Sequence, residues 1–138
     1  YNSRLDEMQA AILNVKLKTL DSDNTRRKKI AKVYDSMLST DQMIKPTERP
    51  DTIHVYHLYV IASNKRDALK INLKERGVLA GIHYPLPVHR NHGYDRKCIL
   101  PVAGLPVTEH VVGTILSLPM YPEITSIQLE EIVKCFVK

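Results

Sequence analysis

The chain has 138 residues, enough for one domain with a sizeable core, and its 43% hydrophobic and 25% charged residues are typical of a globular protein. No apolar run approaches the ~20 residues that span a bilayer, and there is no signal-peptide pattern, so we expect a cytoplasmic setting and no membrane partner. The net charge of +5 is compatible with nucleic acid, an anionic cofactor or an anionic substrate.

The chain has two cysteines, Cys98 and Cys135. They are too few for a disulfide framework and lack the spacing of metal ligands, so we expect both thiols to be reduced. The sequence begins Tyr-Asn-Ser-Arg, its first methionine is Met8, and a helical pattern starts almost at once. We therefore expect it to be an interior part of a longer protein.

The first predicted element is a helix that ends at about Leu20. Ser3 and Asp6 have the spacing of a capping box at its start. Its apolar residues fall on two faces, one formed by Leu5, Met8, Ile12 and Val15 and the other by Ala10, Leu13, Leu17 and Leu20. A helix with one stripe packs on one core, so two stripes predict two partners, such as a second domain or a second subunit. The alternative is a central helix wholly inside one domain.

A second helix is predicted from about Ser22 to Leu38, with Asp21 as its cap. Its predicted buried face consists of Ile30, Val33, Tyr34, Met37 and Leu38. The basic run Arg26–Lys29 lies on the same helix. We interpret this run as a solvated face, because surfaces that bind single strands interleave aromatic residues and this run has none. A nucleic-acid patch is the alternative.

The middle of the chain predicts a strand, a helix and another strand. After a surface connection over 39–51, the segment His54–Ala62 is rich in Val, Ile and Tyr and is apolar on both faces, as in a central strand. The helix that follows runs to Arg76 and stops at Gly77. The segment Val78–His83 is predicted to be the next strand.

The last third of the chain predicts an irregular region to Pro106, a short helix from about Thr108 and a strand over Thr114–Leu118. Thr125 and Gln128 form a capping box that opens the last helix. The whole order is helix, helix, strand, helix, strand, helix, strand, helix. This order predicts an α/β domain in which helices cover a small sheet.

The loop Gly81–His89 contains two histidines, a tyrosine and two prolines. Pro85 and Pro87 fix φ and remove backbone donors, so they force an extended and poorly paired path that no regular structure carries. Stiff loops with polar tips are common positions for functional sites. The loop alone leaves two interpretations open: a site, or a rigid surface turn with incidental histidines.

Other common sites have little support in the sequence. His54 and His57 are three residues apart on a predicted strand, so they point to opposite faces, and His89 and His92 have no acidic or thiol neighbour except Asp95. We therefore expect no metal. There is also no G-x-S-x-G elbow, no P-loop and no G-x-G-x-x-G motif.

Five segments, in order, resemble the motifs of one family. Residues 1–11 resemble its YN-x-R-LDE-x-QAA signature, and residues 17–31 and 54–67 have its spacing. Residues 81–89 are similar to its IHYP-x-P-x-H, and residues 116–122 resemble its LSLPMYP. These are motifs of the DegT/DnrJ/EryC1/StrS family, which comprises pyridoxal-phosphate-dependent aminotransferases of nucleotide-linked keto sugars.

The resemblance implies the aspartate-aminotransferase fold (fold type I), with only its C-terminal part in this chain. The expected fold class is α/β, a small and mainly antiparallel sheet flanked by helices. Residues 1–20 would link to the large domain and the dimer interface, and residues 21–138 would form the C-terminal small domain. The first helix would then be covered by the rest of a homodimer, so we expect an isolated fragment to self-associate or to displace this helix.

The resemblance also implies pyridoxal 5'-phosphate as the cofactor, bound mainly by the large domain. The family's Schiff-base lysine lies upstream of YN-x-R, so no catalytic residue is expected in this chain, and the fragment alone should be inactive. Asn2 would reach the neighbouring subunit's cofactor phosphate, and Arg4 would support the same anionic region or form a salt bridge at the helix start. His83, Tyr84 and His89 would bind the sugar nucleotide, because their donors suit its oxygens.

The implied substrate is a nucleotide-linked 3-keto or 4-keto hexose, often 6-deoxy, with glutamate as the amino donor. The HYPLPVH form of the loop is more similar to members that make 3-amino sugars. Two alternatives remain open: a sugar dehydratase of the same fold, in which histidine replaces the lysine, and a non-catalytic basic binding module. We expect no nucleic-acid partner for the aminotransferase.

Overall fold

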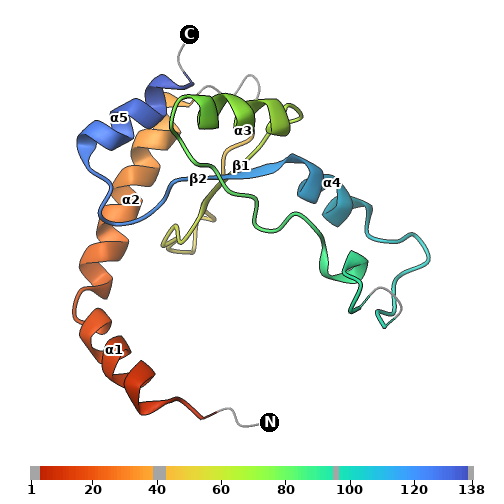
Figure 1. Cartoon of the computed structure of the whole chain (residues 1–138), viewed down its shortest axis with the longest axis horizontal. Coiled ribbons are helices and arrows are strands. Elements are labelled where there is room, and N and C mark those ends of the chain that lie inside the picture. Colours follow the sequence, from red (N-terminus) through yellow and green to blue (C-terminus); the bar gives the residue numbers. More distant parts are fainter. Residues whose placement is uncertain (1–3, 39–42, 95–96, 137–138) are drawn as a thin grey trace.

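The computed structural model describes residues 4–38, 43–94 and 97–136. Figure 1 shows helices arranged around a small central sheet, with the first helix lying away from the rest. The elements in chain order are α1 (Glu7–Leu17), α2 (Leu20–Met37), β1 (Tyr59–Ala62), α3 (Arg66–Glu75), the short 3-10 helix η1 (Val88–Arg90), α4 (Pro106–Thr114), β2 (Ile115–Leu118) and α5 (Ser126–Lys134).

The sheet consists of β1 and β2, which pair antiparallel with Tyr59 opposite Leu118. Isolated bridges extend both edges, because Ile44 pairs with Ala62 on the β1 side and Gly81 pairs with Ser117 on the β2 side. The predicted α/β class with a small antiparallel sheet flanked by helices is confirmed.

The core joins three helices to this sheet. Tyr34 of α2 stacks at a tilt on Tyr59 of β1, with 4.8 Å between the ring centroids, and its hydroxyl donates to the Pro119 carbonyl oxygen at 2.8 Å. The buried hydrophobic residues are Ile30, Ala31, Tyr34, Leu38, Tyr56, Tyr59, Ile61, Leu73, Val78, Leu116, Leu118, Met120, Ile132 and Val133. The predicted buried face of α2 is correct except at Met37, which is exposed. The helix ends at Met37, and the extended Leu38 occupies the core instead.

The first predicted helix is two helices in the structure. Asp6 is the N-cap of α1, because its carboxylate accepts from the Met8 amide at 2.9 Å, whereas Ser3 lies outside the described residues. The helix ends at Leu17 because the chain turns at Thr19, whose hydroxyl donates to the Lys16 carbonyl oxygen. Thr19, not the predicted Asp21, is then the N-cap of α2.

Helix α1 has no buried residue, so both of its apolar stripes face away from the core. Leu5, Met8, Ile12, Leu13, Val15, Leu17 and Leu20 are all exposed. The alternative of a central helix wholly inside one domain does not hold for the described chain. An apolar surface of this extent normally contacts a partner.

The predicted strand His54–Ala62 is wrong in its first half, since β1 begins only at Tyr59. Tyr56 has a φ of 50° in the left-handed region, and its amide donates to His54 Nδ1. Arg27 Nη1 donates to the carbonyl oxygens of Tyr56 and His57. These backbone groups are therefore bound by side chains instead of by a neighbouring strand.

The segment predicted as the strand Val78–His83 pairs only at Gly81, through hydrogen bonds of 2.9 and 2.8 Å with Ser117. The prolines that follow stop the pairing.

The local signals at helix ends are confirmed. Gly77 has a φ of 80° just after α3, and the Thr125–Gln128 capping box opens α5. Helix α4 starts at Pro106, two residues before the predicted position, because proline suits the first helical position.

The basic run on α2 is not a uniformly solvated face. Arg26 and Lys29 are exposed, but Arg27 is half-buried and its Nη1 also donates to the Met120 carbonyl oxygen at 3.0 Å. The guanidinium thus joins α2 to the two segments that flank the sheet.

Arg27→Ala should therefore lower the free energy of unfolding by about 1.5–3 kcal/mol, the range for hydrogen bonds made by a charged group. Urea denaturation followed by circular dichroism measures this change. Arg26→Ala is the matched control and should change stability by less than about 0.5 kcal/mol. Equal effects of the two substitutions would contradict a structural role for Arg27.

Candidate functional site around the proline loop

The predicted cofactor-binding residues lie at the start of the chain. Asn2 is outside the described residues, so its role stays a prediction. Arg4 is exposed in the segment that leads into α1. This segment is at the end of α1 that lies away from the sheet (Figure 1).

The start of the proline loop is fixed to the edge of the sheet. The Gly81 amide and carbonyl pair with those of Ser117 on β2. Two residues later, His83 Nδ1 lies 2.9 Å from Ser117 Oγ. A Cβ atom on Gly81 would lie only 2.7 Å from His83 Cε1, so the imidazole ring rests against the glycine backbone.

The tip of the loop presents two of the three predicted substrate-binding residues. His83 and Tyr84 are both exposed, and their rings meet edge-on with 5.7 Å between centroids. Pro85 and Leu86, which follow, are also exposed. The structure therefore brings His83 and Tyr84 together on one surface, with donors that can reach a ligand.

His89 lies apart from this pair, at the end of the loop. It belongs to η1, a short regular element where the sequence predicted none, and is only 7% exposed. Its Nε2 lies 3.1 Å from Glu109 Oε1, and Arg90 Nη2 donates to the same oxygen at 2.8 Å. The hydrogen bonds from His89 and then from Arg90 lower the pKa of the Glu109 carboxyl. Substrate binding by His89 stays a prediction, while its contact in the structure is with Glu109.

Helix α4 and strand β2 thus hold both ends of the proline loop, through Glu109 and Ser117. Sequence reasoning missed these two residues. Their partners lie 20 and 34 positions away in the chain, and neither residue occurs in a local pattern that indicates such a contact.

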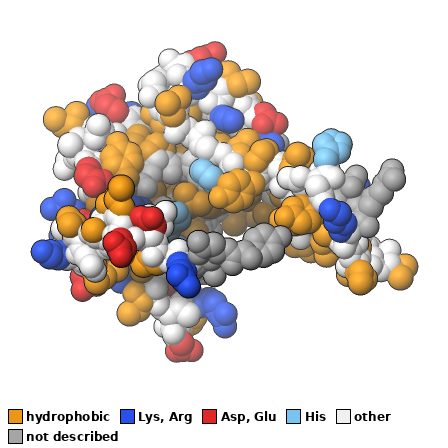
Figure 2. All heavy atoms as spheres, turned by 60° about the horizontal axis from the view of Figure 1, so that its bottom comes forward, with side chains coloured by type: hydrophobic (Ala, Val, Ile, Leu, Met, Phe, Trp, Pro, Cys, Tyr) orange, Lys and Arg blue, Asp and Glu red, His pale blue; other side chains and the backbone are white. Residues whose placement is uncertain are grey.

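Beyond η1 the chain extends away from the sheet before it returns through α4, on the right in Figure 1. Exposed apolar residues lie along this extension, including Ile99, Leu100 and Val102. Figure 2 shows hydrophobic side chains over the same extension.

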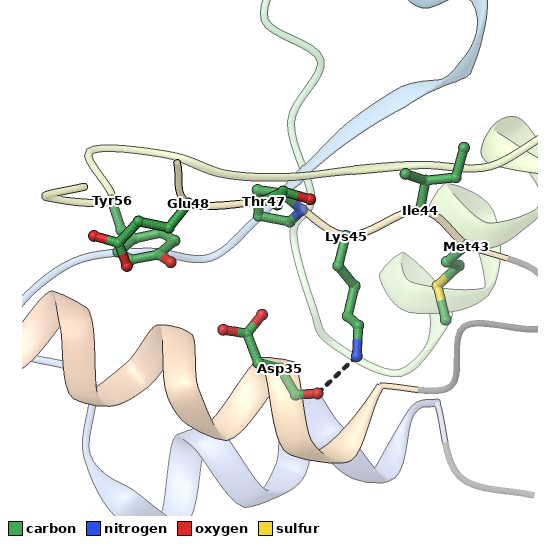
Figure 3. A pocket seen from close by; sticks show the side chains of 8 residues that line it. Asp35, Met43, Ile44, Lys45, Thr47, Glu48 and Tyr56 are labelled. Carbon is green, nitrogen blue, oxygen red and sulfur yellow. Dashed lines mark hydrogen bonds between the residues drawn. The ribbon is translucent and has the colours of Figure 1, made fainter. Parts of the chain in front are cut away.

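A separate open pocket of about 560 Å³ lies between α2 and the segment that bridges to β1 (Figure 3). Lys45 points from this segment to the end of α2, where its Nζ donates to the carbonyl oxygens of Asp35 and Leu38 at 2.7 and 3.2 Å. The pocket is lined by Asp35, Met43, Ile44, Lys45, Pro46, Thr47, Glu48 and Tyr56. Lys45 therefore satisfies carbonyls that the helix end leaves unpaired.

The carboxylates of the pocket are also bound within the protein. Asp35 Oδ1 accepts from the Tyr59 hydroxyl at 2.6 Å, and Glu48 Oε1 accepts from the His54 amide at 2.7 Å. Burial and then the hydrogen bond to Asp35 raise the pKa of Tyr59 above its ordinary value. The polar groups of this pocket stabilise the fold around the end of α2.

Among the described residues, no group of three or more His, Cys, Asp or Glu side chains is placed to hold a metal ion. Within the same ranges, no helix combines the length and the apolar character needed to cross a membrane.

The sequence profile of the DegT/DnrJ/EryC1/StrS aminotransferase family matches residues 1–137 of this chain. The chain belongs to this family. The match includes every motif quoted above, together with the N-terminal residues that the structure does not describe.

Two relatives in the family are named for what they make. A dTDP-3-amino-3,6-dideoxy-alpha-D-galactopyranose transaminase from Aneurinibacillus thermoaerophilus is 37% identical over 133 residues, which cover 96% of this chain and 36% of the relative. A dTDP-3-amino-3,4,6-trideoxy-alpha-D-glucose transaminase from Streptomyces venezuelae is 42% identical over 124 residues, which cover 89% and 32%. The chain spans about a third of the length of these relatives.

A crystal structure of a DegT DnrJ EryC1 StrS aminotransferase from Brucella abortus has the same fold, with a TM-score of 0.88 and 35% identity over 98% of this chain and 36% of that one. The crystal structure of S. venezuelae DesV in complex with a ketimine intermediate matches with a TM-score of 0.89 and 38% identity, over 96% of this chain and 36% of that one.

The pocket of Figure 3 does not fit pyridoxal phosphate. A site for this cofactor needs an amine that can form an imine and donors that hold a phosphate. In the pocket of Figure 3 the Lys45 amine is bound to two carbonyl oxygens, and Asp35 and Glu48 add negative charge that repels a phosphate. This pocket therefore supplies no free amine for an imine with the cofactor.

Proposed function

We propose that this chain is the C-terminal small domain of a pyridoxal-phosphate-dependent aminotransferase that aminates a nucleotide-linked keto sugar. The observation that carries the proposal is the match of nearly the whole chain to sugar aminotransferases, in sequence and in fold. The exposed pair His83 and Tyr84 is consistent with it, because the pair presents donors on a stiff loop.

The substrate is proposed to be a nucleotide-linked 3-keto sugar, with a 4-keto sugar as the second possibility. Support comes from the names of the two relatives, which both carry the new amino group at position 3. His83 and Tyr84 would form one wall of the sugar-nucleotide pocket, and Pro85 would limit their motion, which reduces the ordering cost of binding. Glutamate is the proposed amino donor.

The cofactor would be held mainly by the part of the enzyme that lies outside this chain. Asn2, and Arg4 with it, would face the phosphate group, since amide and guanidinium donors suit phosphate oxygens. The uncovered stripes of α1 support a homodimer in which this helix contacts the large domain and the second subunit.

The proposal is tested with the complete protein that contains this chain, supplied with pyridoxal phosphate, glutamate and a dTDP-linked 3-keto-6-deoxyhexose. We expect one amino sugar for each 2-oxoglutarate formed, measured by mass spectrometry and a coupled dehydrogenase assay. The 138-residue chain alone is the control and should show no turnover. A product that has lost a hydroxyl group without gaining nitrogen would contradict the aminotransferase and support the dehydratase.

A further inference from the structure

Ser117 is an unusual residue for the middle of the sheet, because it is polar and only 3% exposed. Its backbone amide and carbonyl are already paired with Gly81. Its hydroxyl makes a separate contact. In the described part of the chain, the partner of the hydroxyl is His83 Nδ1 at 2.9 Å.

The direction of this hydrogen bond follows from the burial of Ser117. A serine hydroxyl carries one hydrogen, and a neutral imidazole carries one proton on either of its two nitrogens. If Nδ1 carried the proton, it would donate to Oγ, and the hydroxyl hydrogen would then be buried without an acceptor among the described residues. Burying an unpaired donor is costly, whereas His83 Nε2 lies on an exposed side chain and can find water or a ligand.

We propose that Ser117 donates to Nδ1 and thereby fixes His83 as the tautomer that carries its proton on Nε2. Ser117 is thus a positioning residue, since it acts through His83. The proposal rests on the proposed function, in which His83 faces the sugar nucleotide. It adds which nitrogen of the His83 imidazole carries the proton.

Gly81 fixes the position of the same ring. The 2.7 Å that would separate a Cβ on Gly81 from His83 Cε1 is shorter than real carbon contacts, so a side chain at Gly81 would displace the imidazole from its position beside Ser117. The sheet edge therefore sets both the place and the protonation pattern of His83.

The outcome is an N–H donor at Nε2 on an exposed side chain. Such a donor suits an acceptor oxygen, either the keto or hydroxyl oxygen of a sugar or the oxygen of a diphosphate. It would not suit a ligand group that can only donate a hydrogen bond. The fixed tautomer thus predicts acceptor chemistry at the ligand atom nearest to His83.

The first test is the tautomer itself, in the complete protein labelled with ¹⁵N-histidine. At about pH 8, where imidazoles are ordinarily neutral, long-range ¹H–¹⁵N spectra should show His83 with its proton on Nε2. Ser117→Ala should convert this signal into a mixture of tautomers. Ser63→Ala is the matched control, because Ser63 is also buried and its hydroxyl, in the described structure, binds the Lys65 amide and not a histidine. A proton on Nδ1 in the unmodified protein would overturn the proposal.

The second test is a double-mutant cycle on the steady-state kinetics of the same protein. Ser117→Ala should raise KM for the sugar nucleotide about fivefold, the equivalent of one ordinary hydrogen bond, and Ser63→Ala should not. In the His83→Ala background, Ser117→Ala should have no further effect on KM. Effects that simply add would overturn the proposal, because Ser117 would then act independently of His83.

The two tests separate the proposal from the function on which it rests. If His83→Ala changes neither kcat nor KM, the substrate contact of His83 is wrong, and the spectra still decide whether Ser117 sets the tautomer. If the spectra show Nδ1 protonated while His83→Ala impairs the enzyme, the function stands and the role of Ser117 is wrong.

Discussion

Replacing Leu116 with alanine should lower the free energy of unfolding by about 2–5 kcal/mol. Leu116 is 0% exposed and lies on β2, where it pairs with Ile61 across the sheet. Alanine would remove apolar contacts and leave a cavity that a packed two-stranded sheet cannot close by relaxing. Since a domain of this size is typically stable by about 5–15 kcal/mol, the loss would be a large share of the total.

The measurement is urea denaturation followed by circular dichroism, with Leu79→Ala as the matched control. Leu79 is 76% exposed, so the same substitution there should cost less than about 0.5 kcal/mol.

Leu116 is an informative position for this substitution because Leu116 and Ser117 are neighbours on one strand and their side chains point to opposite faces. Leu116→Ala should therefore change stability, while Ser117→Ala should change the site. Equal costs for Leu116→Ala and Leu79→Ala would contradict the core described here.

The elements that can be predicted from the sequence are those whose signals are local. Gly77 ends α3 and the Thr125–Gln128 box begins α5, since each depends only on residues within one turn of the helix. The strand Ile115–Leu118 is also predicted, one residue longer than observed. A short segment of mostly apolar residues before a proline leaves few other structures for it.

The elements that cannot be predicted depend on contacts between distant residues. The composition of His54–Ala62 is that of a strand, yet Arg27, about 30 positions earlier, binds the carbonyl oxygens of Tyr56 and His57. No pattern within the segment indicates that a distant side chain binds these carbonyl oxygens in place of a neighbouring strand. The same holds for the single bridge at Gly81, whose partner Ser117 lies in a strand much later in the chain.

In the candidate site, too, some residues can be predicted from local sequence and others depend on distant contacts. His83 and Tyr84 can be singled out from the loop sequence, because prolines beside polar residues indicate a stiff and exposed tip. The residues that hold the two ends of the loop cannot be predicted in this way, since Ser117 and Glu109 reach His83 and His89 only when β2 and α4 fold against the loop. The prediction for His89 rests on its residue type, and burial against Glu109 is a feature that residue type does not encode.

In the complete enzyme, His83→Ala should lower kcat/KM for the sugar nucleotide by about tenfold or more. The reason is the loss of the proposed hydrogen bond from His83 to the substrate, since a donor to an anionic or strongly polar oxygen contributes about 1.5–3 kcal/mol. The assay varies the sugar nucleotide at saturating glutamate. His110→Ala is the matched control, because His110 is an exposed histidine on α4 for which no substrate contact is predicted.

The division of this loss between KM and kcat reveals what His83 does. A higher KM with unchanged kcat means that His83 binds the substrate and the transition state equally, as one wall of the pocket does. A lower kcat means that the contact strengthens as the reaction proceeds, which would place His83 beside the reacting carbon instead of the nucleotide. The first result is the expected one, because His83 is held at the sheet edge by Ser117 and this chain is not expected to contain the lysine of the reaction. If neither constant changes, His83 contributes to the fold of the loop and not to the site, and the pocket wall must be sought at Tyr84 or elsewhere.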